Sequence, residues 1–283
     1  MAPDSLEGAL ALKTEHGDDA KFLAGGQSLI PAMNFRLAQT ALLIDVNNLK
    51  ELDYIRRDAN GDLHLGALTR QRRLERDPLV KQYAPLLHEA MPWVAHPQIR
   101  NRGTLGGSLA HADPAAELPV IALALGARLR AQTARDERWI TVDDFFRGLF
   151  TTDLASDEML VEVVLPPLPP RTGAAFIEFS RRRGDYAMLG LAAIVTLNES
   201  GACEKARLVY LNAGDGPVDA KQAADLLKGQ KPSAEVFAAA ASLAAEQEIN
   251  PMGSIHASPD YQRHLARVLT GRALKQAFAR ASQ

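Results

Sequence analysis

The stretch Thr104-Leu105-Gly106-Gly107-Ser108 joins two adjacent glycines to small hydroxyl residues, and Ala24-Gly25-Gly26-Gln27-Ser28 repeats that chemistry far upstream. Glycine tolerates positive φ and lets backbone N–H groups approach a ligand without a Cβ in the way. Successive N–H groups in such a turn form a concavity that binds anions. Two facing loops of this kind predict a diphosphate held from both sides, although either loop alone could be a tight turn.

Length and composition set the protein class. The 283 residues suit about two domains. Hydrophobic residues at 47% and charged residues at 23% are ordinary for a globular protein with a sizeable core. The formal net charge of −2 argues against nucleic acid or an anionic membrane as the main partner. A polyanionic ligand must therefore be held locally, by backbone N–H groups and a few arginines.

Several common sites are absent from the sequence. The single cysteine, Cys203, excludes an internal disulfide and a four-thiolate iron–sulfur cluster, and it is expected to be buried and inert. There is no GxGxxG motif after a strand, no GxxxxGK[ST] motif and no HExxH motif. His111-Ala112-Asp113 is interpreted as a polar capping segment, so no metal site is predicted.

The sequence shows no recognisable signal peptide or membrane-spanning segment. Met1-Ala2-Pro3-Asp4 has neither a positive region nor an apolar core, so no signal peptide is expected. No apolar run approaches the roughly 20 residues that a membrane span needs. We therefore expect no membrane span and a cytoplasmic location.

Hydrophobic periodicity predicts a small α/β unit, then a sheet-rich unit, then a sheet with helices. Ser5 is expected to cap the first helix and Thr69 another. A proline cluster at 166–170 marks the main boundary. Strands are expected at 21–24, 42–46, 54–57, 63–66, 127–131, 139–142, 160–165, 175–180, 190–198 and 205–213, and helices at 85–91, 145–147, 220–227, 234–248 and 259–281. This order is typical of an α+β fold.

Two further features have both a structural and a functional interpretation. Glu117 is either an exposed acid on the first turn of a helix or an acceptor for ribose hydroxyls of a nucleotide. Ser180-Arg181-Arg182-Arg183-Gly184-Asp185-Tyr186 is either a solvated basic turn or a loop beside a flavin ring. In the second case Tyr186 would lie against the ring and the arginines would face a redox partner.

The two glycine loops, at 24–28 and 104–108, and the segment at 180–186 together resemble the FAD-binding medium subunit of the molybdenum hydroxylases. This is the family of xanthine dehydrogenase, carbon monoxide dehydrogenase and quinoline oxidoreductase. The resemblance covers nearly the whole chain and includes Ala112-Asp113-Pro114-Ala115-Ala116-Glu117 and Gly253-Ser254-Ile255-His256. It implies a two-subdomain FAD-binding domain of the vanillyl-alcohol-oxidase (PCMH) type at 1–170, with subdomains of about 1–52 and 53–170. A C-terminal domain of the CO-dehydrogenase flavoprotein type at 171–283 would hold a three-stranded antiparallel sheet and a helical bundle.

The resemblance also implies which residues hold the cofactor. Ser28 and Thr104 would donate hydroxyl groups to the diphosphate, and Glu117 would accept hydrogen bonds on the adenosine side. No catalytic residue acting on the organic substrate is expected in this chain. The residues expected to bind FAD are Phe22, Leu23, Ala24, Gly25, Gly26, Gln27, Ser28, Leu29, Thr104, Leu105, Gly106, Gly107, Ser108, Glu117, Leu160 and Tyr186.

The function that the resemblance implies is electron transfer through FAD within a heterotrimer. Two alternative functions remain open. A small subunit would carry two [2Fe–2S] clusters and a large subunit the molybdopterin, in a dimer of heterotrimers. The complex would hydroxylate an aromatic N-heterocycle or oxidise an aldehyde or CO. The rivals are a standalone flavin-dependent oxidase or reductase of the same fold, and a binding module without a cofactor.

Overall fold

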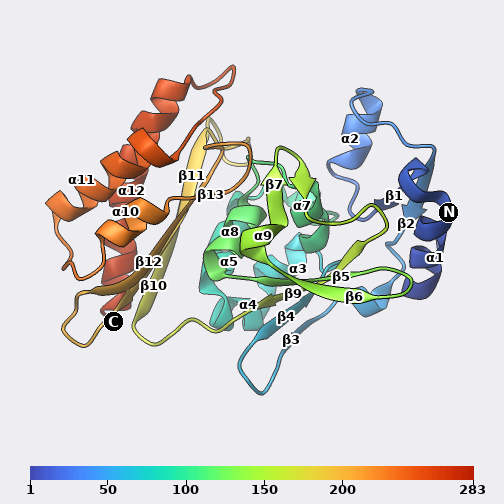
Figure 1. Cartoon of the computed structure of the whole chain (residues 1–283), viewed down its shortest axis with the longest axis horizontal. Helices are drawn as coiled ribbons and strands as arrows, with labels where there is room; N and C mark the ends of the chain where they lie inside the picture. Colours follow the sequence, from blue (N-terminus) through green and yellow to red (C-terminus); the bar gives the residue numbers. More distant parts are fainter.

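The N-terminal unit is a small α/β layer. The computed structural model describes all residues 1–283. Helix α1 (Leu6–His16) precedes two parallel strands, β1 (Ala20–Leu23) and β2 (Leu42–Asp45), with the short helix α2 (Leu29–Asn34) between them (Figure 1). The Ser5 hydroxyl accepts a hydrogen bond from the Gly8 N–H at 3.1 Å, which confirms the predicted cap. The first glycine loop lies between β1 and α2.

The middle unit is built on a five-stranded antiparallel sheet in the order β3-β4-β9-β5-β6. The predicted hairpin across the Asn60-Gly61 turn is confirmed as β3 paired with β4. Helix α8 buries all nine of its residues, which explains the apolar run at 118–125. The strands are β3 (Ile55–Arg57), β4 (Leu63–Gly66), β5 (Arg128–Gln132), β6 (Glu137–Thr141) and β9 (Met159–Leu165), with a hairpin of β7 (Phe146–Gly148) and β8 (Thr151–Thr152). The helices are α3 (Gln71–Arg76), α4 (Pro78–Tyr83), α5 (Pro85–Ala90), α6 (Pro97–Arg100), α7 (Leu105–His111), α8 (Glu117–Leu125) and α9 (Val142–Phe145).

The C-terminal unit places a helical layer against an antiparallel sheet (Figure 1). The three predicted long strands are confirmed as β10 (Thr172–Phe179), β11 (Leu189–Leu197) and β12 (Cys203–Leu211), and a two-residue strand β13 (Val218–Asp219) extends the edge. Helices α10 (Lys221–Leu226), α11 (Ala234–Leu243) and α12 (Pro259–Ala281) follow, and α11 continues into the π-helical turn η4 (Ala244–Glu248). Cys203 is buried, and burial raises the pKa of its thiol to about 11, as expected of an inert residue.

One hydrophobic cluster joins the middle and C-terminal units. Ala174 and Phe176 of β10 and Ile194 of β11 pack in the same cluster as residues of α5 and α8. The opposite face of the sheet, with Ala175 and Leu191, packs in a second cluster with α12. The sheet is therefore covered on both faces, by the middle unit on one and by α12 on the other.

Two local predictions are wrong. Arg70, not Thr69, is the N-cap residue of α3, and the buried Thr69 hydroxyl donates to the Tyr54 carbonyl oxygen at 2.9 Å. The helix expected at 145–147 ends at Phe145, because the next residues pair as β7 with β8. In both places a tertiary contact overrides the local signal.

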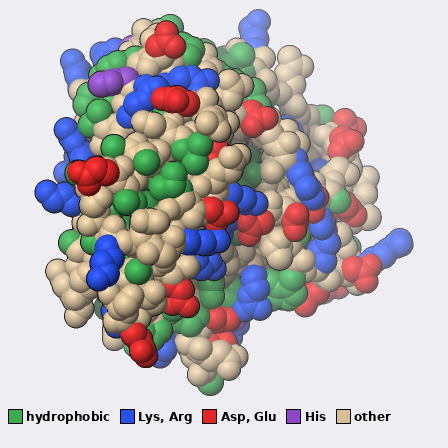
Figure 2. Space-filling model, turned by 60° about the vertical axis from the view of Figure 1, so that its left-hand side comes forward, with side chains coloured by type: hydrophobic (Ala, Val, Ile, Leu, Met, Phe, Trp, Pro, Cys, Tyr) green, Lys and Arg blue, Asp and Glu red, His purple; other side chains and the backbone are tan.

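Neither positive nor negative charge dominates the face of the protein drawn in Figure 2. On the face in Figure 2, basic and acidic side chains are interspersed among apolar ones. No helix is long and apolar enough to cross a membrane.

Candidate functional site

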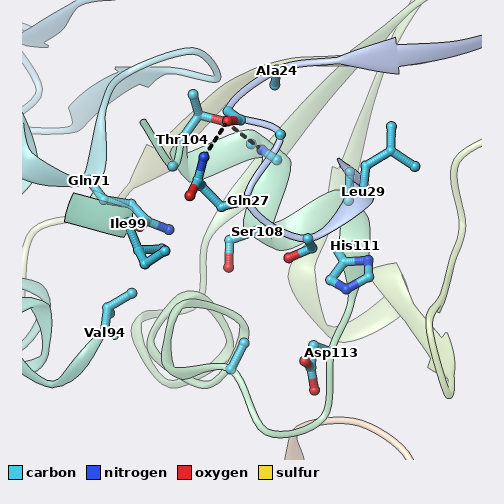
Figure 3. Close-up of a pocket in the computed structure, with 18 of the residues that line it drawn as sticks. Ala24, Gln27, Leu29, Gln71, Val94, Ile99, Thr104, Ser108, His111 and Asp113 are labelled. Atoms are coloured by element: carbon cyan, nitrogen blue, oxygen red, sulfur yellow. Dashed lines mark hydrogen bonds between the residues drawn. The ribbon is translucent and has the colours of Figure 1, made fainter. Parts of the chain in front are cut away.

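The two glycine loops line one cavity, here called the interloop cavity, of about 540 Å³. Its size lies within the roughly 300–1,000 Å³ typical of small-molecule sites. Figure 3 shows Gln27, Thr104 and Ser108 around this space, with Val94 on one side and His111 on another. Of the residues expected to bind a cofactor, Leu105 alone is outside the lining. The others all line it: Phe22, Leu23, Ala24, Gly25, Gly26, Gln27, Ser28, Leu29, Thr104, Gly106, Gly107, Ser108, Glu117, Leu160 and Tyr186.

The two loops are in direct contact, and this contact requires Gly25. A Cβ on Gly25 would lie 2.5 Å from the Arg102 carbonyl oxygen and 2.8 Å from the Gly103 Cα. Arg70 then links the loops, since its guanidinium donates to the Arg102 carbonyl oxygen and, at 2.7 Å, to Asn47 Oδ1. Asn47 in turn donates from Nδ2 to the Ala24 carbonyl oxygen at 2.8 Å. The facing arrangement expected from the sequence is thus confirmed and held by hydrogen bonds.

The first loop has free backbone donors. The N–H groups of Gly25, Gly26, Gln27 and Ser28 donate no hydrogen bond within the protein. Gly26 has φ +73°, the left-handed conformation that favours glycine. A row of free N–H groups at the wall of a cavity suits the oxygens of a phosphate or diphosphate. Gly25 is buried and Gly26 and Gln27 are half-buried, and buried backbone donors are nearly always paired, so this row fits an anionic ligand.

The second loop differs, and here the two-sided clamp expected from the sequence is not formed. The Leu105 N–H donates to the Thr69 carbonyl oxygen at 3.0 Å, and the Gly106 N–H donates to the Ala67 carbonyl oxygen at 2.8 Å. The Gly107 N–H donates to the Thr104 hydroxyl at 3.1 Å. The Thr104 oxygen therefore caps α7, and the backbone donors of this loop hold it to the β4–α3 connection. Leu105 is a core residue, with 3% of its surface exposed.

Glu117 is buried, so the exposed interpretation is wrong. Only 8% of its surface is exposed, because α8 enters the core at its first turn. Burial raises the pKa of Glu117 to about 7, and the nearby Asp113 carboxylate adds to the shift. Glu117 therefore sits at the cavity wall as a carboxyl group that is partly protonated near neutral pH.

The loop at 180–186, here called the arginine loop, closes one end of the cavity with Gly184, Asp185 and Tyr186. Gly184 has φ +92°, and a Cβ there would lie 2.4 Å from His96 Nδ1, so the loop packs tightly on the cavity wall. The Arg181 guanidinium lies 3.1 Å from His256 Nδ1, and Arg183 lies over the Trp93 ring at 5.5 Å. Tyr186 lines the cavity although 76% of its surface is exposed to solvent.

Tyr186 and Glu117 share this end of the cavity. The protein around its hydroxyl raises the pKa of Tyr186, and the carboxylates of Asp113 and Glu117 raise it further. Asp113, Glu117 and Tyr186 all line the cavity, so the two carboxyl groups and the phenol face the same space.

Gln71 is a cavity residue that sequence reasoning missed. Its Oε1 atom is buried and has no hydrogen-bond partner, and the side chain lines the cavity beside Gly103. A buried acceptor without a donor is costly, so a donor on a ligand would satisfy it. No local motif surrounds Gln71. A contact between distant segments brings it to the loop: its N–H donates to the Gly103 carbonyl oxygen at 2.9 Å, beside the isolated bridge between Arg70 and Thr104. Other unpredicted lining residues include Lys21, Val94, His96, Ile99, His111, Asp113, Leu154 and Glu158.

A group of possible metal ligands lies away from the cavity, at the β3–β4 turn. Ligand atoms of Asp58, Asp62 and His64 lie within 4.8 Å of one another. Asp58 Oδ1 already accepts from the Asn60 and Asp62 N–H groups at 2.9 Å, and His64 Nδ1 lies 2.9 Å from Glu162 Oε1. These bonds account for the group as a turn-stabilising network.

The comparisons with known proteins agree with this geometry. The family model of the FAD binding domain in molybdopterin dehydrogenase matches residues 1–168, and that of the CO dehydrogenase flavoprotein C-terminal domain matches residues 174–277. The chain belongs to this flavoprotein family. Its members are oxidoreductase subunits, so the expected fold of an FAD-binding domain followed by a C-terminal domain is confirmed.

Three relatives illustrate the family. The alpha subunit of the 6-hydroxypseudooxynicotine dehydrogenase complex of Paenarthrobacter nicotinovorans is 46% identical over 99% of this chain and 94% of its own. The carbon monoxide dehydrogenase structure from Hydrogenophaga pseudoflava matches with a TM-score of 0.95 and 35% identity, over 99% of this chain and 96% of that chain. The structure of quinoline 2-oxidoreductase from Pseudomonas putida 86 matches with a TM-score of 0.93 and 37% identity, over 100% of this chain and 97% of that chain.

The residues present fit FAD in the interloop cavity. The first loop offers four free N–H groups to a diphosphate, and Gln71 offers an acceptor without a donor. Lys21 adds a positive charge to the lining. FAD, when bound, supplies the redox chemistry, while the protein binds and orients it and sets its surroundings.

Proposed function

We propose that this chain is the electron-transfer subunit of a molybdenum hydroxylase and carries FAD in the interloop cavity. The observation that carries the proposal is the row of free N–H groups from Gly25 to Ser28, facing a second glycine loop in a member of this flavoprotein family. In this role the chain accepts electrons from [2Fe–2S] clusters of a small partner subunit and passes them to an external acceptor. A large partner subunit holds the molybdopterin.

Within the cavity, we assign the diphosphate to the first loop. The residues expected from the sequence remain the proposed contacts of FAD. Those at 104–108 would contact it through the surface of their loop and not by hydrogen bonds to the diphosphate, because the N–H groups from Leu105 to Ser108 and the Thr104 hydroxyl already bond within the protein; Leu105 acts only through the position of its backbone. Glu117 is assigned to the end of the cavity near Tyr186 rather than to the adenosine side, because both residues line the cavity and the Glu117 carboxylate adds to the raised pKa of Tyr186. For the domains we propose the boundaries 1–170 and 171–283.

The substrate of the complex is proposed from the relatives. The names of two of them contain 6-hydroxypseudooxynicotine and quinoline, both aromatic nitrogen heterocycles, whereas a third acts on carbon monoxide. An aromatic N-heterocycle is therefore the proposed substrate class. Assembly as a dimer of heterotrimers and a cytoplasmic location stay predictions.

A visible absorption spectrum of the protein purified from its source with its native partners tests the proposal. Flavin bands overlaid with broad iron–sulfur absorption are expected. Flavin bands alone, on a chain that elutes by itself, would instead favour a standalone flavin-dependent oxidase or reductase. A colourless preparation that takes up no added FAD would contradict both.

A further inference from the structure

Glu178 is a buried carboxyl group that the proposed function does not use. It lies in β10, with 5% of its surface exposed, and neither of its carboxyl oxygens has a hydrogen-bond partner. Side chains alternate along a strand, so Glu178 lies on the same face as Ala174 and Phe176. Those two residues pack in the cluster shared with the middle unit. Glu178 therefore faces the FAD-binding domain, opposite Gly190 of β11, which has no side chain.

Glu117 is a second buried carboxyl group at this boundary, because it begins α8, whose residues pack in the same cluster as Ala174 and Phe176. Burial raises the pKa of Glu178 to about 9, and the Glu117 carboxylate adds to the shift. Neither residue forms an ion pair in the protein, although the chain has many. A carboxyl group buried without a cation is costly when ionised, and two such groups side by side cannot both ionise near neutral pH.

The other charged groups around the pair do not compensate it. Asp113, in the loop before α8, is negative and raises the pKa of Glu117 further. Arg100 of α6 lowers the pKa of Glu117, but its guanidinium is already bonded to Glu75 at 3.0 Å and to the Val94 carbonyl oxygen at 2.8 Å. Tyr186, from the arginine loop, is a neutral phenol. The pair must therefore hold a proton rather than a counter-ion.

Glu117 connects this proton to the ligand site. It lines the interloop cavity, whereas Glu178 does not and belongs to β10 of the C-terminal sheet. Negative charge that arrives in the cavity repels the carboxylate form of Glu117 and raises the proton affinity of the pair. The same charge acts little on ion-paired carboxylates elsewhere in the lining, such as Glu158, which is bonded to Arg138 at 2.6 Å.

We propose that the Glu117–Glu178 pair is a redox-linked protonation site, which takes up one proton when FAD in the interloop cavity is reduced and releases it on reoxidation. The inference rests on the proposed function. Two electrons come from the iron–sulfur partner, and a proton from solvent forms an O–H bond on the carboxylate of the pair. That bond breaks, and the proton returns to solvent, when the electrons leave for the acceptor. In this proposal Glu117 contacts the cofactor, and Glu178 is a positioning residue that acts through Glu117.

The test is the reduction potential of the bound FAD as a function of pH, measured on the native complex. In Glu178→Gln and in Glu117→Gln the pH slope should be shallower than in the wild type by up to about 30 mV per pH unit, the value for one proton per two electrons. Glu158→Gln is the matched control. It removes a cavity carboxylate that is already ion-paired, so it should move the potential by a similar amount at every pH and leave the slope unchanged.

A second measurement, on the FAD-free chain, shows whether the proton is present. Burial raises the pKa of Glu178 from 4.5 to about 9, so between these pH values the folded state binds more protons than the unfolded state. The free energy of unfolding of the wild type should therefore fall as pH rises through this window, and that of Glu178→Gln should fall less. The infrared C=O band of a protonated carboxyl group at pH 7 should weaken in the same variant.

The outcomes separate the two proposals. A wild-type chain that binds no FAD overturns the proposed function and the protonation site with it. An FAD-loaded Glu178→Gln complex with the wild-type pH slope overturns the protonation site alone, even if its infrared band and stability change, because the pair would then be structural. Because the amide is never charged, this variant is expected to fold.

Discussion

The two glycine loops have nearly the same sequence chemistry and opposite hydrogen-bonding states. In the first loop the N–H groups from Gly25 to Ser28 are free, whereas in the second the N–H groups from Leu105 to Ser108 are all bonded within the protein. The first is a ligand cradle, and the second is a capped helix start that supports it. A Gly-Gly pair beside a hydroxyl residue therefore indicates a close backbone approach, but it does not say whether the approaching group is a ligand or the protein itself.

The largest effect is expected from Gly106→Val. A Cβ at this position would lie 2.6 Å from the Ala67 Cβ and 2.9 Å from its carbonyl oxygen, so valine overpacks the contact between α7 and the β4–α3 connection. The free energy of unfolding of the FAD-free chain should fall by about 3 kcal/mol. Urea unfolding measures it. FAD would be lost as a consequence of the disturbed fold.

Gly216→Val is the control for this substitution. Nothing lies within 4 Å of a Cβ on Gly216, so its unfolding curve should stay close to that of the wild type. If Gly106→Val unfolded like the wild type and lacked only FAD, the second loop would be a ligand cradle like the first, and the contrast between them would be lost.

Gly26→Ala probes the first loop with a smaller expected effect on the fold. Its Cβ would meet only the side chains of Ile30 and Leu23, both at 3.3 Å, and alanine at φ +73° costs about 1–2 kcal/mol. Relaxing that strain should turn the free N–H groups away from the cavity. The FAD dissociation constant should then rise by tenfold or more, a difference of about 1.4 kcal/mol.

Equilibrium titration of the FAD-free chain measures this change. Gly201→Ala offers a matched control, since Gly201 also has positive φ, at +77°, but lies in an open turn with nothing within 4 Å. It should cost similar stability and leave FAD affinity intact. Equal affinities for FAD in Gly26→Ala and Gly201→Ala would contradict the assignment of the diphosphate to the first loop.

The sequence alone predicted the class of fold, nearly all of the long elements and the position of both loops. These features depend on local patterns: Ser5 before an apolar helix, an Asn-Gly turn between strands, and two adjacent glycines. It could not predict what the loop N–H groups contact, because the acceptors of Leu105 and Gly106 lie on Thr69 and Ala67, far along the chain. It also missed Gln71 at the cavity wall and the partnership of Glu117 with Glu178, since only tertiary packing brings these side chains together.

The smallest effect is expected at Thr104, where the contrast between the loops depends on a single hydroxyl group. Thr104→Val removes the acceptor of the Gly107 N–H, a cap worth about 1 kcal/mol, whereas Thr104→Ser keeps it. Because that oxygen already serves the helix, the valine variant should lose stability in thermal unfolding of the FAD-free chain and keep the wild-type FAD dissociation constant. A tenfold weaker affinity for FAD in Thr104→Val, with Thr104→Ser normal, would instead show that the hydroxyl binds the cofactor. The second loop would then take part in binding through its side chain while its backbone stays committed to the fold.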